Sequence, residues 1–125
     1  MDFDKVVQGL SYEKKLAIAR FSLEVAAADG EIDQSELLTI VAICQAKLDL
    51  DLTDKIDVIT ETDYKSSLVK FSMEEAVFLG LVLGIIASAD GVVSSVEVRH
   101  TRSLLQQAGL NSDLIEAVIE TFENS

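Results

Sequence analysis

Long segments of the chain have hydrophobic positions at helical spacing, and short polar breaks separate these segments. This pattern predicts a series of helices. A short first helix is expected over residues 4–8, and Gly9 ends it. Longer helices are expected over residues 12–28, 34–47, 53–62, 74–89, 95–108 and 112–123, with a polar break at 63–67. Ser11, Ser72 and the Asn111-Ser112-Asp113 cluster supply caps at three helix starts. The pattern predicts an all-α bundle of about six to seven helices.

The segment 74–89 is apolar nearly all round, whereas the segment 12–28 keeps a polar face. The most hydrophobic part of the segment 74–89 is the run AVFLGLVLGIIASA at positions 76–89. This run is shorter than the roughly 20 residues of a membrane-spanning helix, so we expect a central buried helix and no membrane insertion. Gly80 and Gly84 lie four positions apart on it and would let a neighbouring helix approach closely.

Residues of the first half of the chain recur in the second half at a constant offset in residue number. This offset is the separation between positions 29 and 90. This offset relates Asp29-Gly30 to Asp90-Gly91, and it also places Ser11 on Ser72, Glu13 on Glu74, Ala26 on Ala87, Glu36 on Glu97 and Gln45 on Gln106. Each half reads Ser-x-Glu, an apolar helix, the Asp-Gly break and a second helix. We therefore expect one domain over residues 1–125, built from two pseudo-symmetric helix-pair repeats at about 11–62 and 72–123.

Composition agrees with this fold and restricts the partners. The chain of 125 residues fits one domain, contains no proline and is 49% hydrophobic. Its formal net charge of −12, from 22 acidic and 10 basic residues, repels nucleic acid and anionic lipid. A basic protein partner or a divalent cation is expected instead; the alternative is that acidity only maintains solubility. The first residues, MDFDKVVQGL, show no signal-peptide pattern, so the expected localisation is cytoplasmic.

The residues that usually carry catalysis are scarce. Cys44 is the only cysteine, which excludes an internal disulfide and a Cys-rich zinc site, and its apolar surroundings predict a buried structural thiol. His100 is the only histidine and is expected at a solvent-exposed helix position. No Gly-rich loop is followed by Lys-Ser or Lys-Thr. A non-enzymatic protein is expected, and a carboxylate-based, metal-dependent hydrolase is the remaining enzymatic alternative.

The stretch AAADGEIDQSELL and its later counterpart have a structural interpretation. Asp33-x-x-Glu36 and Ser94-x-x-Glu97 both read as capping boxes, in which the glutamate bonds back to the amide of the cap residue. The glycine of each Asp-Gly pair suits the left-handed residue that ends a helix. On this interpretation each loop only turns the chain between two helices.

A second interpretation is metal binding, because the same stretch resembles part of an EF-hand loop. Asp29 and Asp90 are expected at helix C-termini, where an anion costs about several tenths of a kcal/mol unless a positive group compensates. Amides of the next helix, a basic side chain or a bound cation would compensate. Val25 and Ala27 occupy the first two ligand positions, which excludes an ordinary high-affinity EF-hand.

Five acidic residues of the two loops are the candidate ligands of Ca²⁺ or another divalent cation. They are Asp29, Asp33, Glu36, Asp90 and Glu97. Calcium takes about six to eight oxygens, so carbonyls, waters or the second repeat must complete the shell. Ser94 replaces the middle carboxylate in the second loop. A calcium sensor or buffer with a degenerate EF-hand-like loop is an alternative function.

The paired motifs AAADGEIDQSE and ASADGVVSSVE, each between two helices, resemble those of the TerB-like family, named for a tellurite-resistance protein and similar to a domain of DjlA-type J-domain co-chaperones. The resemblance spans roughly residues 10–122. It implies an all-α bundle of about seven helices from two helix-pair repeats, and a role as an interaction or stress-response module. It also implies that the five acidic loop residues bind divalent cations. The chain lacks the His-Pro-Asp of a J-domain, and Ser94 departs from a symmetric pair of metal sites.

Overall fold

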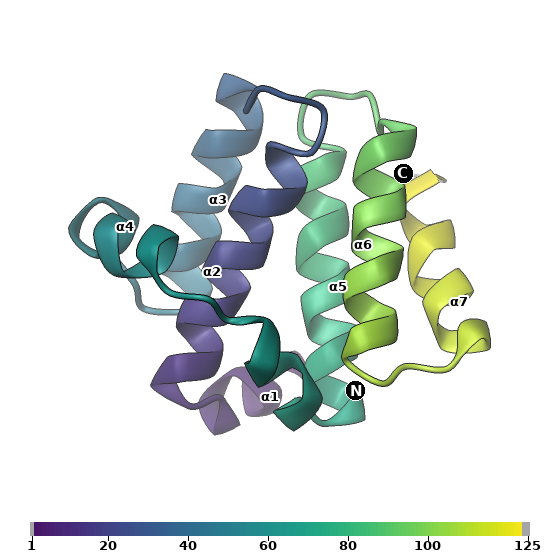
Figure 1. The fold of residues 1–125 in the computed structure, drawn as a ribbon, viewed down its shortest axis with the longest axis horizontal. Helices are drawn as coiled ribbons and strands as arrows, with labels where there is room; N and C mark the ends of the chain where they lie inside the picture. Colours follow the sequence, from purple (N-terminus) through teal and green to yellow (C-terminus); the bar gives the residue numbers. More distant parts are fainter. Residues whose placement is uncertain (1, 124–125) are drawn as a thin grey trace.

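The computed structural model describes residues 2–123, and every regular element in that range is a helix (Figure 1). The elements in chain order are α1 (Phe3–Gly9), α2 (Tyr12–Ala26), α3 (Gln34–Lys47), α4 (Leu52–Glu61), the 3₁₀ helix η1 (Lys65–Lys70), α5 (Met73–Ala87), α6 (Ser95–Gln107) and α7 (Ser112–Glu123). The predicted all-α bundle is confirmed.

Two predicted boundaries were wrong in the same way. α2 and α5 end at Ala26 and Ala87, two residues before the predicted ends. The chain leaves each helix through a turn in which the glycine has a positive φ, 109° at Gly30 and 84° at Gly91. These glycines have left-handed backbone angles as predicted, but each lies a few residues after the last residue of its helix.

The predicted polar break was also partly wrong, because η1 forms there. The amide of Lys65 donates to Asp63 Oδ1 (3.0 Å), and the hydroxyl of Ser67 donates to the carbonyl of Tyr64 (2.5 Å). Leu68 is fully buried and attaches this short helix to the core. Local hydrogen bonds and one apolar anchor thus order a segment whose composition is that of a loop.

The predicted caps are present at three helix starts. Ser11 accepts from the amide of Lys14, and Asn111 accepts from the amide of Leu114 (2.9 Å). Ser72 forms a complete capping box, since Glu75 also accepts from the Ser72 amide at 2.8 Å. These bonds satisfy amides that have no partner inside the helix.

The helix bounds recur with the offset found in the sequence. Moving α2 by this offset gives the bounds of α5, and the first residue of α3 moves onto the first residue of α6. α4 and α7 correspond to within a residue or two at each end. The division into two repeats stays a prediction from the sequence, and these bounds agree with it.

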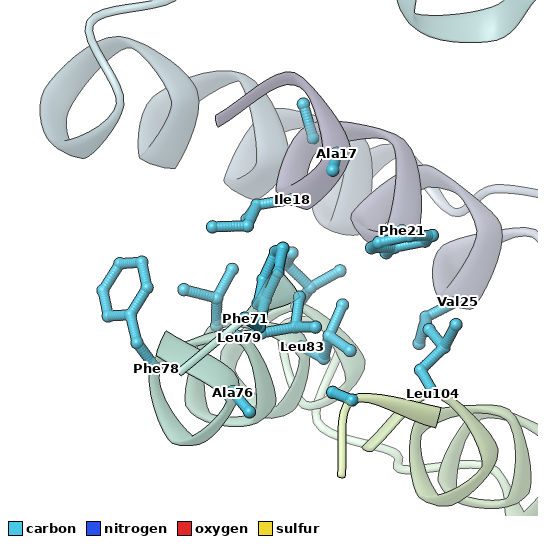
Figure 2. Close-up of a cluster of buried hydrophobic side chains, with 14 of the residues drawn as sticks. Ala17, Ile18, Phe21, Val25, Phe71, Ala76, Phe78, Leu79, Leu83 and Leu104 are labelled. Atoms are coloured by element: carbon cyan, nitrogen blue, oxygen red, sulfur yellow. The ribbon is translucent and has the colours of Figure 1, made fainter. Parts of the chain in front are cut away.

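α5 lies at the centre of the bundle and contacts α1, α2, α3, α6 and α7. Figure 2 shows Ile18 and Phe21 of α2 facing Leu79 and Leu83 of α5 across the core. The apolar run therefore forms a buried helix, as predicted. Over residues 2–123, no helix combines the length and apolar character that crossing a bilayer requires.

Two further predictions about buried positions are confirmed. α7 packs closely on the glycines of α5: a Cβ on Gly80 would meet Val118, and one on Gly84 would meet the ring of Phe122. Cys44 is 1% exposed, and burial raises the pKa of its thiol to about 11.

Candidate metal centre

The α2–α3 and α5–α6 loops lie side by side at one end of the bundle, opposite α1 (Figure 1). Asp33 caps α3, Glu36 lies in its first turn, and Asp90 belongs to the α5–α6 loop. One carboxylate oxygen from each of these three residues lies within 4.8 Å of the other two. The two loops, which the sequence presented as separate candidates, thus contribute to one acidic cluster.

Glu36 and Glu97 form the buried side of this cluster. Each is only 2% exposed, and their carboxyl groups are within hydrogen-bond reach of each other. Both residues lie in the first turn of a helix, α3 and α6 respectively, where the helix dipole favours a negative charge. The dipoles do not remove the repulsion between two neighbouring carboxylates in a dry environment.

Glu36 responds to this environment with a strongly raised pKa. Burial raises the pKa of Glu36 from 4.5 to about 8, and the hydrogen bond with Glu97 and the charges of Glu97 and Asp90 act in the same direction. The backbone N–H of Asp33 opposes the shift by favouring the charged form. Without a cation, this environment therefore favours a proton held between Glu36 and Glu97.

When both glutamates are ionised, each has one unsatisfied oxygen. Among the described residues, no donor lies within hydrogen-bond reach of Glu36 Oε2 or Glu97 Oε2. A hydrogen bond between the two carboxyl groups requires a proton on one of them, because carboxylates only accept. The pair is thus satisfied either by a shared proton or by a cation.

The capping interpretation explains only part of this arrangement. Ser94 and Glu97 form a complete capping box, as predicted. At α3 Glu36 interacts with the Asp33 amide as predicted, but Asp33 accepts from the amide of Ser35 (2.8 Å), one residue before Glu36, so the box is incomplete. Capping places each glutamate near its helix start, but it does not require the two glutamates to be buried together.

Asp29 and Asp90 differ in their surroundings. Both follow a helix by three residues and do not lie in its last turn, so the predicted conflict with the helix dipole was misplaced. Asp90 Oδ1 accepts from the amide of Val92 (2.9 Å), which supplies a compensating positive group. Asp29 is exposed and does not belong to the group of three clustered carboxylates.

The sequence analysis did not predict the polar contact between α2 and α6. His100 Nε2 lies 3.5 Å from Glu24 Oε2, and Arg20 Nε donates to Glu24 Oε1 at 3.2 Å. His100 is half-buried against α2, contrary to the expectation of a solvent-exposed position. The spacing of Arg20 and Glu24 on one helix face was the available signal for their ion pair, but the contact with His100 depends on tertiary packing.

The clustered donors are all carboxylate oxygens. Such donors suit hard divalent cations such as Ca²⁺, Mg²⁺ and Mn²⁺, whereas thiolate and imidazole ligands favour softer ions. Asp33, Glu36 and Asp90 each bring one oxygen to the cluster, and Glu97 lies within hydrogen-bond reach of Glu36. Compared with known proteins, the chain matches no protein-family model, no curated protein and no solved structure.

Proposed function

We propose that this protein is a non-enzymatic interaction module whose two loops bind one divalent cation between them. The observation that carries this proposal is the meeting of Asp33, Glu36 and Asp90 within 4.8 Å, backed by the buried Glu36–Glu97 pair. A like-charged buried pair is costly unless a proton or a cation lies between its members. A cation would neutralise the pair and join the two helix pairs of the bundle.

The proposed ligands are Asp33, Glu36 and Asp90, with Glu97 as an inner neighbour that ligates or orients Glu36. Calcium suits this set best, because its coordination is flexible and it tolerates a mixture of carboxylates, carbonyls and water. The proposal agrees with what TerB-like membership would imply, namely an interaction or stress-response module. It differs from that expectation in having one site shared by the two loops.

The test is a calorimetric calcium titration of protein stripped with chelator. Wild type is expected to bind one ion per chain, and Asp90→Asn and Asp33→Asn are expected to weaken binding at least tenfold. Asp29→Asn is the matched control, since it removes an equal charge from the same loops outside the cluster. At a free calcium concentration about a hundred times Kd, bound ion should add about 2.7 kcal/mol to stability.

A flat titration with Ca²⁺, Mg²⁺ and Mn²⁺ would overturn the proposal. So would equal losses of affinity in Asp29→Asn and Asp90→Asn, because the effect would then be general electrostatics. A stoichiometry of two ions per chain would mean that each loop binds its own ion and that the two loops do not share one site.

A further inference from the structure

A groove of about 480 Å³ lies between α1, α3, α5 and α7, and none of the three clustered carboxylates lines it. Its lining is mainly apolar and includes Phe3, Ile43, Phe78, Leu81, Ile85 and Phe122. Lining residues recur every three to four positions from Phe78 of α5 to Ser88, the residue that follows this helix. This spacing marks one face of the central helix, about 15 Å long at about 1.5 Å per residue.

Some of the apolar side chains that line the groove are exposed to solvent. Ile85 is 56% exposed and Phe3 is 37% exposed, although both lie beside the core. The exposed apolar surface extends along α3, where Leu38 is 61% exposed and Ile43 lines both the groove and a shallower depression. Continuous exposed apolar surface of this kind is typical of interaction sites.

On the corresponding face of α2, polar side chains take the place of the apolar residues that line the groove. The offset between the two halves places Arg20 on Leu81 and Glu24 on Ile85. Arg20 donates to the carbonyls of Ile59 (3.1 Å) and Thr60 near the end of α4, and so bridges α2 to α4. Leucine and isoleucine make no such bonds, so this face of α5 forms no polar bridge to a neighbouring helix and stays apolar.

The charges around the groove favour a basic occupant. α5 and α7 contain no lysine or arginine, and α7 carries the exposed acids Asp113, Glu116 and Glu120, of which Glu116 pairs with Arg102 of α6. Asp4 and Lys47 are the charged residues of the lining and offset each other, within a chain of net charge −12. A cationic partner is therefore attracted to this face over long range.

We propose that the groove between α1, α3, α5 and α7 binds an amphipathic basic helix of a partner protein. The apolar side chains of that helix, spaced at i, i+3 or i+4, and i+7, would fill the groove over about three turns. Its basic side chains would face the acidic surface of α7 and the surrounding solvent. This inference is independent of the proposed cation site.

The test uses a fluorescent leucine-lysine peptide, LKKLLKLLKKLLKL, titrated with the full chain in the presence of EDTA. Saturable one-to-one binding is expected, with chemical shift changes confined to residues that line the groove. The acidic counterpart LEELLELLEELLEL should bind at least tenfold more weakly. EDTA keeps this result separate from any result on the metal centre.

Ile85→Lys should weaken binding about tenfold or more, because it places a positive charge in the apolar lining of the groove. Val69→Lys is the matched control: Val69 is 77% exposed on η1, outside the groove, and the charge change is identical. Both variants replace exposed side chains and should keep the wild-type Tm. Phe3→Ala is a second groove variant that changes no charge.

Equal weakening by Ile85→Lys and Val69→Lys, or equal binding of the acidic peptide, would overturn the proposal. Absence of peptide binding together with Ile85-dependent sedimentation on phosphatidylcholine vesicles would also overturn it and assign the groove to a lipid surface.

Discussion

Lys14 Nζ lies 2.8 Å from Glu75 Oε1, and the two residues are separated in the sequence by the same offset as Glu36 and Glu97. Both contacts join positions that this offset places in register. They lie at opposite ends of the bundle, near the starts of α2 and α5 and at the loops that follow these helices. One contact pairs opposite charges and stabilises the fold directly; the other pairs like charges and needs a proton or a cation.

The Lys14–Glu75 pair should contribute more than an exposed ion pair. Burial disfavours the charged form of Glu75, but hydrogen bonds from Lys14 and the Ser72 amide outweigh it and lower the Glu75 pKa. A double-mutant cycle of Lys14→Met and Glu75→Gln should give a coupling free energy of about 1 kcal/mol by urea unfolding. The exposed Lys55–Asp54 pair, at 3.4 Å, is the control and should give close to zero. Equal coupling in both cycles would contradict this prediction.

Stability should depend on pH through Glu36. Its pKa is about 8 in the folded state and 4.5 in the unfolded chain, so the folded state holds an extra proton between these values. In EDTA, the free energy of unfolding should therefore be highest toward pH 5 and fall as the pH rises to about 8, by up to about 1.4 kcal/mol per pH unit. Urea unfolding at several pH values measures this slope.

Glu36→Gln removes the titrating group and should flatten this dependence, making the variant more stable than wild type at pH 8. Glu31→Gln, an exposed change in the same loop, should leave the wild-type slope intact. A flat wild-type profile over this range would show that Glu36 titrates normally.

Gly84→Ala should destabilise the protein by about 1–3 kcal/mol, because the added methyl group would collide with the ring of Phe122 in a packed interface. Gly80→Ala, which meets Val118 and Leu105, should have a smaller effect. Gly9→Ala is the control, since a Cβ there meets nothing within 4 Å and the residue lies at the end of α1. Thermal unfolding ranks the three variants, and a wild-type Tm for Gly84→Ala would refute the close helix packing.

Cys44 should react only when the protein unfolds. The thiol is buried and its pKa is raised to about 11, so very little thiolate is present at pH 8 and no reagent reaches it. Labelling with iodoacetamide in native buffer should be at least a hundredfold slower than in guanidinium chloride. Rapid labelling of the native protein would reveal local opening of α3.

Much of the fold could be predicted from local patterns. The serine and asparagine caps, the helix bounds to within about two residues and the burial of the segment around Gly80 and Gly84 all follow from short-range sequence. These features depend on capping hydrogen bonds and on apolar periodicity, which act over a few residues. η1 was missed because a single buried leucine, Leu68, holds an otherwise polar segment.

The candidate site could be predicted only in part. The sequence identified the two acidic loops and their five carboxylates, because the Asp-Gly motif occurs twice. It did not determine that Asp90 joins Asp33 and Glu36, that Asp29 lies outside this group, or that Glu36 and Glu97 are buried together. Those relationships connect residues in different halves of the chain, and no local pattern encodes the distance between two loops.

The sequence by itself determined the α-helices, most of their caps, the central apolar helix and the acidic character of the chain. The tertiary structure alone decided that the two loops meet, that Glu36 and Glu97 share one buried space, and that α5 leaves an apolar groove beside α7. The physical reason is that helix formation and capping are local, whereas desolvation and electrostatic repulsion depend on which surfaces packing brings together.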